Sequence, residues 1–281
     1  MEFTSLQGEQ RYAALVRAAP GALVGLDFDG TLAPIVDDPE QARIHPEAAA
    51  ILADLAEQVL GVAVITGRPA RQALDLGLDV VGDDVAAAGK DLYLFGQYGN
   101  ERWQNSGTGR IVGPRPPPGL ASFERELTRT LQRAEAAGAF VEDKGLAVAV
   151  HTRRLGDAEA AFARLLPALR DLAARHDLVV EPGRSVIEIR SPGVHKGTAV
   201  TTLVEELDVE GFLFAGDDLG DLEAFEAVRD LARDGVATLL VCSSSEEENA
   251  LQPLADVVVD GPQGVLELLA QLAEDARNTR A

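Results

Sequence analysis

The chain has 281 residues, of which 46% are hydrophobic and 25% charged, so it is long enough for about two domains and has the composition of a folded protein. Its formal net charge of −21 repels phosphate backbones and anionic lipids, which excludes nucleic acid and membranes as expected partners. The single cysteine, Cys242, allows no intramolecular disulfide, and the first residues lack the features of a secretory signal. Because no apolar segment is long enough to span a membrane, we expect a cytoplasmic protein.

Apolar strands and helical patterns alternate in the first hundred residues. Buried strands are predicted at residues 22–28, 61–67 and 91–99, and a helix at 45–58, where Leu52 and Leu55 have helical spacing. The order strand, helix, strand is typical of a parallel sheet with helices on both faces.

The same pattern returns near the C-terminus. Strands are predicted at residues 211–218 and 236–243, and residues 257–276 predict a short strand followed by a helix. The two ends of the chain therefore resemble each other in architecture, and we expect both to contribute to one sheet.

The middle of the chain differs from both ends and begins with the proline-rich segment 113–120, which resists helix and central strand. Helices are predicted at 122–138 and 157–176, with a kink or turn at Pro167 in the second. Each helix is followed by a predicted pair of strands, which gives the order α-β-β-α-β-β. This order indicates a small α+β domain inserted into the first domain.

We therefore expect a core domain in two parts and one insertion. The first part of the core comprises residues 1–113, and the second part comprises residues 193–281. The inserted domain comprises residues 114–192, which separate the two parts.

Two acidic residues, Asp27 and Asp29, follow the first predicted strand. Ligands of an open parallel sheet bind beyond the carboxyl ends of its strands. Residues two apart on an extended chain point the same way, so both carboxylates can face one site while Phe28 turns into the core.

Polar clusters also follow later predicted strands or begin a predicted helix. These clusters are, in chain order, Thr66 with Arg68, then Lys196, and finally Asp217 with Asp218 and Asp221. Each cluster alone could be an ordinary turn or polar loop. Their common position at strand ends indicates instead that they form one site.

The residue types in these clusters suit phosphoryl transfer. Mg²⁺ prefers carboxylate oxygens, and we assign it to Asp27, Asp217 and the backbone carbonyl of Asp29. The Thr66 hydroxyl and the Lys196 ammonium are then natural partners for phosphoryl oxygens. Phosphoryl transfer is catalysed mainly by such positioning and charge.

The segments DFDGTLAPI, VITGR, HKG and FAGDDLGD, in this order, resemble the four motifs of the haloacid dehalogenase superfamily of phosphatases. Residues 96–103, 142–153 and 186–197 are similar to stretches typical of trehalose-6-phosphate phosphatases, and the likeness extends over about residues 20–265. The resemblance implies an α/β fold, with a Rossmann-like parallel-sheet core of the haloacid dehalogenase type and an inserted α+β cap domain.

The resemblance also implies Mg²⁺-dependent hydrolysis of a small-molecule sugar phosphate, trehalose 6-phosphate, and a functional link to a trehalose-6-phosphate synthase. Asp27 is then the nucleophile that forms an aspartyl-phosphate, and Asp29 is the acid and later the base. The remaining implied roles are phosphoryl binding by Thr66 and Lys196, metal binding by Asp217, and support by Asp218 and Asp221.

The family likeness further implies a set of substrate contacts. These are Gly67, Arg68 and Arg102 in the core, and Glu142, Lys144, His151, Arg153 and Glu188 in the cap. On the residues alone, Glu142 and Lys144 could equally form a solvated hairpin tip, and His151 could be structural. The chain departs from the family pattern at three positions: Tyr98, where His is common, and Gly220 and Leu222, where Thr and Glu are common.

Other functions remain open at this point. A phosphatase of the same superfamily that acts on sucrose phosphate or mannosylglycerate phosphate would share the core motifs. A phosphomutase would need a second cluster of Arg and Lys on the cap, and no such cluster is obvious. A catalytically silent regulatory module is disfavoured because the acids and the lysine of the motifs are intact.

Overall fold

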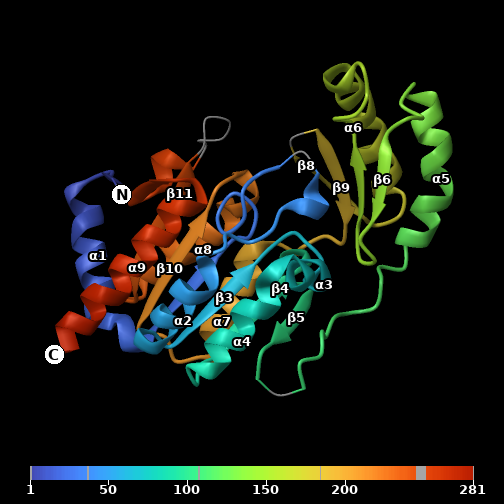
Figure 1. Cartoon of the computed structure of the whole chain (residues 1–281). Helices are drawn as coiled ribbons and strands as arrows, with labels where there is room; N and C mark the ends of the chain where they lie inside the picture. Colours follow the sequence, from blue (N-terminus) through green and yellow to red (C-terminus); the bar gives the residue numbers. More distant parts are fainter. Residues whose placement is uncertain (1, 37, 107, 184, 245–250, 281) are drawn as a thin grey trace. The chain divides into compact units, whose positions relative to one another are not determined.

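The computed structural model of the chain describes residues 2–36, 38–106, 108–183, 185–244 and 251–280 (Figure 1). The chain divides into two compact units. The core unit consists of Met1–Val112 and His195–Ala281, and the insert consists of Gly113–Val194. Among the described residues, no helix is both long and apolar enough to cross a membrane.

The core unit is built on one sheet, whose middle strands from β12 to β4 are parallel. In spatial order the strands are β1 (Glu2–Phe3), β12 (Val257–Asp260), β11 (Ala237–Ser244), β10 (Gly211–Gly216), β2 (Ala22–Leu26), β3 (Gly61–Ile65), β4 (Leu92–Gly96) and β5 (Glu101–Gln104). The two edge strands, β1 and β5, pair antiparallel to their neighbours. The predicted parallel sheet is confirmed, and the sequence did not predict its edge strands.

Helices cover both faces of this sheet because successive strand residues point to opposite sides. On one face, Val24, Leu26 and their neighbours pack against α1 (Leu6–Ala18), α2 (Ala48–Gln58), α4 (Asp79–Ala87) and α9 (Gly261–Arg280). On the other face, Leu23, Phe212 and Phe214 pack against α7 (Lys196–Glu206) and α8 (Leu222–Arg233). The strands thus read as continuous apolar segments since both of their faces are buried.

Short segments complete the core unit. The short helix α3 (Ala70–Ala73) continues through Leu74–Leu78 into α4. Single helical turns lie at Ala19–Gly21, Pro39–Gln41, Gln97–Gly99, Leu219–Asp221 and Gln252–Leu254. Two of these turns, Gln97–Gly99 after β4 and Leu219–Asp221 after β10, carry Tyr98 and Asp221 of the predicted motifs.

The insert is a four-stranded antiparallel sheet with two helices on one face. Its strands, in spatial order, are β6 (Phe140–Asp143), β7 (Val148–His151), β9 (Val186–Arg190) and β8 (Val179–Gly183). Val148, Val150, Ile187 and Ile189 pack against α5 (Leu120–Arg133) and α6 (Ala158–Ala174). The other face carries polar side chains, and Glu142, Glu188 and Glu181 lie in one cross-strand row with Ala149.

Helix α6 continues through Pro167, so the proline does not end the helix, and the kink expected at this residue stays a prediction. Leu165 and Leu169, on either side of the proline, are fully buried in the core of the insert. Tertiary packing of the apolar face therefore outweighs the cost of a proline inside a helix.

Candidate active site

The loops after β2 and β10 meet at the carboxyl end of the sheet. The N–H of Asp27 donates to the carbonyl of Ala215 at 2.9 Å, which joins the ends of the two strands. Gly30 has a φ of +69°, and a Cβ at this position would lie 2.1 Å from an Asp217 carboxylate oxygen. Only glycine therefore lets the loop after β2 pass so close to Asp217.

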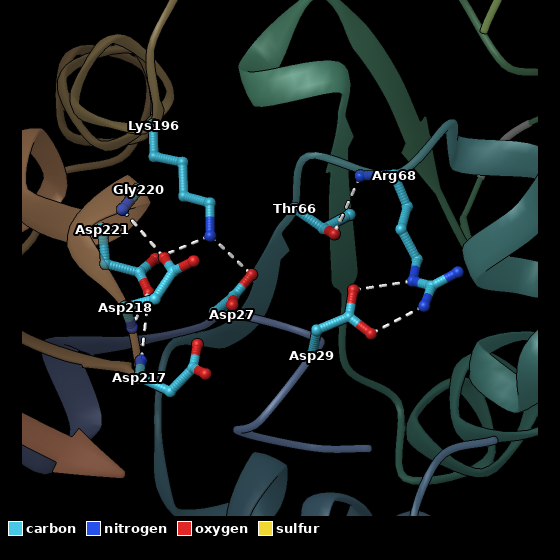
Figure 2. Close-up of polar contacts among 9 residues, drawn as sticks. All are labelled: Asp27, Asp29, Thr66, Arg68, Lys196, Asp217, Asp218, Gly220 and Asp221. Atoms are coloured by element: carbon cyan, nitrogen blue, oxygen red, sulfur yellow. Dashed lines mark hydrogen bonds and ion pairs between the residues drawn. The ribbon is translucent and has the colours of Figure 1, made fainter. Parts of the chain in front are cut away.

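Lys196, the first residue of α7, lies between two carboxylates (Figure 2). Its Nζ is 2.6 Å from Oδ1 of Asp27 and 2.6 Å from Oδ1 of Asp221. The side chains of Lys196, Asp27 and Asp221 are 4%, 6% and 0% exposed. Asp221 also accepts a hydrogen bond from the N–H of Asp217, so it links the lysine to the loop after β10.

The carboxylates of this cluster outnumber its cations. Asp27, Asp217 and Asp221 each offer an oxygen, and these oxygens lie within 4.8 Å of one another. Burial and the charges of Asp27, Asp221 and Asp218 raise the pKa of Asp217 to about 10. Burial and the charge of Asp221 likewise raise the pKa of Asp27 well above its usual range.

The two other charged groups respond to the same surroundings. Burial is the main cause that raises the pKa of Asp221 to about 6, against the lowering effect of Lys196. Burial alone would lower the pKa of Lys196, but the charges of Asp221 and Asp27 raise it well above its usual range. A buried group of oxygen ligands with excess negative charge fits a hard divalent cation such as Mg²⁺.

Asp29 engages a different partner from Asp27. Arg68 donates from Nε and Nη2 to the two carboxylate oxygens of Asp29, each at 2.7 Å (Figure 2). Strand β2 ends at Leu26, so the alternation of an extended strand does not fix the directions of the residues beyond it. Phe28 is fully buried, as predicted. The Asp29 side chain thus lies outside the carboxylate cluster, and its predicted metal contact uses the backbone carbonyl.

The loop after β3 is hydrogen-bonded to the loop after β4. Tyr98 and Gln97 donate their backbone N–H groups to the carbonyls of Thr66 and Arg68, at 2.9 and 2.8 Å. The Thr66 hydroxyl is buried and accepts from the N–H of Arg68 at 3.1 Å. A Cβ on Gly67 would lie 2.7 Å from the ring and hydroxyl of Tyr98. Tyr98, at a position where the family pattern has His, therefore packs directly against Gly67.

Asp218 lies at the exposed start of the turn after β10. Its Oδ1 accepts from the N–H of Gly220 at 2.8 Å, and it forms a reciprocal capping box with Asp221. Asp218 thus shapes the loop that carries Asp217, and its predicted role in supporting the metal stays a prediction. Leu222 begins α8.

The structure does not bring Arg102 to the carboxylate cluster. Its Nη1 donates to Oε1 of Glu206 at 2.6 Å, and its guanidinium lies 5.4 Å from the centre of the Phe95 ring. Glu206 is the last residue of α7 and Lys196 is the first, so about 15 Å of helix separates them. Arg102 therefore contacts the opposite end of the helix that supplies the lysine.

Its neighbour Glu101 was missed by the sequence analysis. Oε2 of Glu101 accepts from the N–H of Ala70 at 2.6 Å, directly after the loop that carries Thr66 and Arg68. The contact satisfies a backbone donor at the start of α3 and holds that loop against β5. Nothing local in the sequence indicates this contact, since the partners are 31 residues apart.

Most of the residues predicted for substrate binding in the insert form pairs on the polar face of its sheet. Nε2 of His151 lies 2.9 Å from Oε2 of Glu142, and Nζ of Lys144 lies 2.6 Å from Oε2 of Glu188. The four side chains come from β6, β7, β9 and the turn after β6. Arg153 is exposed in the turn after β7 and stands apart from these pairs.

Two further residues of this face were missed by the sequence analysis. Arg190 donates from Nη2 to Oε2 of Glu181 at 3.0 Å. The signal was available, because residues 186, 188 and 190 of a strand point the same way, so Arg190 lies on the face of Glu188. After β7, Arg154 lies with its guanidinium 5.5 Å from the centre of the Phe140 ring.

Comparison with known proteins identifies the relatives of this chain. The family model for trehalose-phosphatase matches residues 25–260. The chain is 34% identical over 277 residues to an uncharacterized glycosyl hydrolase of Mycobacterium tuberculosis, in a match that covers 95% of this chain and 19% of that protein. It is 31% identical over 230 residues to a probable trehalose-phosphate phosphatase of Sinorhizobium fredii, and this match covers 80% of each.

The fold also has solved counterparts. The C-terminal domain of C. albicans trehalose-6-phosphate phosphatase has a TM-score of 0.76 and 21% identity, over 97% of this chain and 98% of that one. Together with a haloacid dehalogenase-like hydrolase of Bacteroides thetaiotaomicron, this similarity confirms the predicted fold class. Because the family model matches most of its sequence, the chain belongs to the trehalose-phosphatase family.

Proposed function

We propose that the protein is a Mg²⁺-dependent phosphatase that hydrolyses trehalose 6-phosphate to trehalose and phosphate. The observation that carries the proposal is the position of Lys196, within 2.6 Å of both Asp27 and Asp221 and next to Asp217, at the carboxyl end of the sheet. Membership of the trehalose-phosphatase family supports the choice of substrate.

The metal site consists of the side chains of Asp27 and Asp217 with the backbone carbonyl of Asp29. Asp221 offers an additional oxygen in the same cluster, although it also pairs with Lys196. When bound, Mg²⁺ supplies positive charge next to the phosphoryl oxygens and offsets the repulsion among the carboxylates.

The first chemical step belongs to Asp27. One of its oxygens forms a bond to phosphorus as the bond from phosphorus to the sugar oxygen breaks, which gives an aspartyl-phosphate and the free sugar. Asp29 donates the proton that the departing sugar oxygen takes up. Lys196, at the start of α7 and 2.6 Å from Asp27, and the Thr66 hydroxyl, directly after β3, hold the phosphoryl group.

The second step regenerates the enzyme. Asp29, now a carboxylate, accepts a proton from the water molecule that attacks the phosphorus, and the bond to Asp27 breaks. Phosphate leaves and Asp29 is again protonated, so the two half-reactions balance. Asp218 supports both steps by fixing the loop that carries Asp217.

Sugar recognition belongs to the inserted domain, residues 114–192. The proposed contacts are Glu142, Lys144, His151, Arg153 and Glu188, together with Gly67 of the core unit. Paired acids and bases present many hydrogen-bonding groups, which suits a sugar that carries many hydroxyls. Arg102 is not retained as a contact, because its guanidinium pairs with Glu206 at the far end of α7.

A cytoplasmic location and a functional link to a trehalose-6-phosphate synthase are part of the same proposal. Sucrose phosphate and mannosylglycerate phosphate are the alternative substrates, since the chemistry of the core unit does not distinguish among sugar phosphates. A catalytically silent regulatory module would not need the acids and the lysine of the motifs, and this chain retains Asp27, Asp29, Lys196 and Asp217.

Phosphate release tests the proposal. Trehalose 6-phosphate is compared with sucrose 6-phosphate, glucose 6-phosphate and mannosylglycerate phosphate in the presence of Mg²⁺. Asp27→Asn provides the background, and Asp83→Asn, an exposed aspartate of α4, is the matched control. We expect a strong preference for trehalose 6-phosphate that is lost in Asp27→Asn and kept in Asp83→Asn. Turnover of another sugar phosphate would reject the substrate, and inactivity toward all four would reject the function.

A further inference from the structure

All three nitrogens of the Arg68 guanidinium donate to acceptors of the protein. Nε and Nη2 donate to the two oxygens of Asp29, each at 2.7 Å, and Nη1 donates to the carbonyl of Pro39 at 2.9 Å. Its central carbon lies 5.5 Å from the centre of the Phe28 ring. Each of the three nitrogens therefore has an acceptor in the protein. The guanidinium cannot rotate without losing several of these contacts.

The two partners differ in how firmly they are held. The Arg68 side chain is 9% exposed, whereas that of Asp29 is 40% exposed. The Arg68 backbone is also tied on both sides, since its N–H donates to Thr66 Oγ1 and its carbonyl accepts from Gln97. Arg68 is thus the fixed member of the pair, and the half-exposed Asp29 takes its orientation from it.

A direct role of Arg68 in binding phosphate is hard to reconcile with these contacts. A guanidinium that binds a phosphoryl group offers it a free pair of parallel N–H donors. In this structure, the pair formed by Nε and Nη2 faces Asp29 instead (Figure 2). The contacts of Arg68 therefore differ from the substrate contact that the sequence predicts.

We propose that Arg68 is a positioning residue that orients the Asp29 carboxyl group for proton transfer to the departing sugar oxygen. The inference rests on the proposed function, in which Asp29 is the acid. A bidentate contact uses one lone pair of each oxygen and sets the plane of the group, while the other lone pairs stay available for the proton. As the bond from phosphorus to the sugar oxygen breaks, that proton moves from Asp29 to the sugar oxygen.

The role predicts a dependence on the leaving group. A sugar alkoxide is a poor leaving group and needs the proton, whereas p-nitrophenolate leaves without one. The ratio kcat/KM reports only the steps up to release of the alcohol, so it isolates the step in which Asp29 acts as acid. Loss of orientation should therefore lower kcat/KM for the sugar phosphate much more than for p-nitrophenyl phosphate.

The experiment measures kcat and KM for trehalose 6-phosphate and p-nitrophenyl phosphate with Mg²⁺. The variants are Arg68→Gln, Arg68→Lys, Asp29→Asn and the double variant with Arg68→Gln and Asp29→Asn. Arg71→Gln, an exposed arginine of α3, is the control. Thermal unfolding of every variant shows whether it is folded. If Arg68→Gln is not folded, Arg68→Lys takes its place in the comparison.

We expect Arg68→Gln to lower kcat/KM about 10- to 100-fold for the sugar phosphate, mainly through kcat, and less than about threefold for p-nitrophenyl phosphate. Arg68→Lys should recover only part of the loss, because an ammonium keeps the charge and lacks the bidentate geometry. In the Asp29→Asn background, Arg68→Gln should cost nothing further, since a residue that acts through Asp29 has no effect without it.

Three results would overturn the inference. An undiminished effect of Arg68→Gln in the Asp29→Asn background would show that Arg68 binds substrate directly. Equal losses for the two substrates would mean that proton transfer is not affected, and complete recovery by Arg68→Lys would mean that charge alone matters. Failure of the proposed function is distinct, because it appears as an inactive wild type before any variant is compared.

Discussion

The two polar regions of the molecule distribute their charge in opposite ways. In the part of the core unit that the structure describes, Asp27, Asp217, Asp218 and Asp221 lie around the ammonium group of Lys196. On the polar face of the insert, each acid has its own partner: Glu142 has His151, Glu188 has Lys144 and Glu181 has Arg190. The first region carries excess negative charge, whereas these three acids of the second region are paired.

This difference indicates the ligand that each region suits. Crowded buried carboxylates repel one another, and a divalent cation removes that repulsion when it binds. Balanced pairs satisfy one another and still present donors and acceptors, so they suit a neutral ligand with many hydroxyls. The difference supports the proposal that the core unit binds metal and phosphate and that the insert binds sugar.

Removal of the metal should have the largest effect and should act on the core unit alone. We expect EDTA to lower phosphatase activity at least about 10³-fold, with recovery on addition of excess Mg²⁺. Mg²⁺ at 100 times its Kd should also stabilise the folded protein by about 2.7 kcal/mol, measured as a rise in Tm. Glu181→Gln in the insert should leave this rise unchanged. Full activity in EDTA would refute the assignment of a metal to the carboxylate cluster.

Replacement of Asp217 should separate activity from stability. Asp217→Asn removes a metal ligand, and we expect about a 10²-fold loss of activity or more. The pKa of Asp217 is raised from 3.8 to about 10 in the folded protein, so folding takes up a proton, and stability falls as the pH rises between these values. The amide of the Asp217→Asn variant does not ionise, so the variant does not lose stability in this way as the pH rises.

Without metal at pH 8, Asp217→Asn should therefore be more stable than the wild type by at least about 1 kcal/mol, the free energy of one unit of pKa shift. Urea unfolding in EDTA measures the difference, which should shrink as the pH falls toward 5. With Mg²⁺ present, the gain should disappear, since the wild type then binds the cation. A variant that is less stable than the wild type in EDTA would contradict the excess of negative charge.

Within the insert, breaking one pair should affect substrate binding rather than chemistry. We expect Lys144→Gln to raise KM for trehalose 6-phosphate about tenfold, or about 1.4 kcal/mol of binding, with little change for p-nitrophenyl phosphate. The double variant with Glu188→Gln should regain the stability lost on leaving Glu188 unpaired, but not the low KM. A loss of kcat with both substrates would place these residues in the chemical step instead.

The smallest effect is expected for Arg102→Gln. The pair with Glu206 is partly exposed, at 34% and 42% for the two side chains, so its loss should cost about 0.5–1 kcal/mol of stability. We expect kcat and KM to change less than about threefold, because the guanidinium lies at the opposite end of α7 from Lys196. A tenfold rise in KM would show that Arg102 contacts the substrate after all.

The layers of the core unit and the order of its motifs can be predicted from the amino-acid sequence alone. Apolar segments such as 22–26 and 61–65 are buried on both faces, which is a local property of composition, and they form β2 and β3 as predicted. The order of helices and strand pairs after the proline-rich segment 113–120 predicted the insert, whose sheet carries two helices on one face. By contrast, β5 is half-buried throughout and has no such signal, which is why the edge of the sheet was missed.

The tertiary structure alone decided which charged groups meet. Asp27 and Asp29 are two residues apart, but one pairs with Lys196 and the other with Arg68, a partner 39 residues away. The same holds for Arg102, whose direction depends on the packing of α7 against the sheet. Periodicity and composition are set by neighbouring residues, whereas the partner of a charge is set by the free energy of burying groups that only the folded chain brings together.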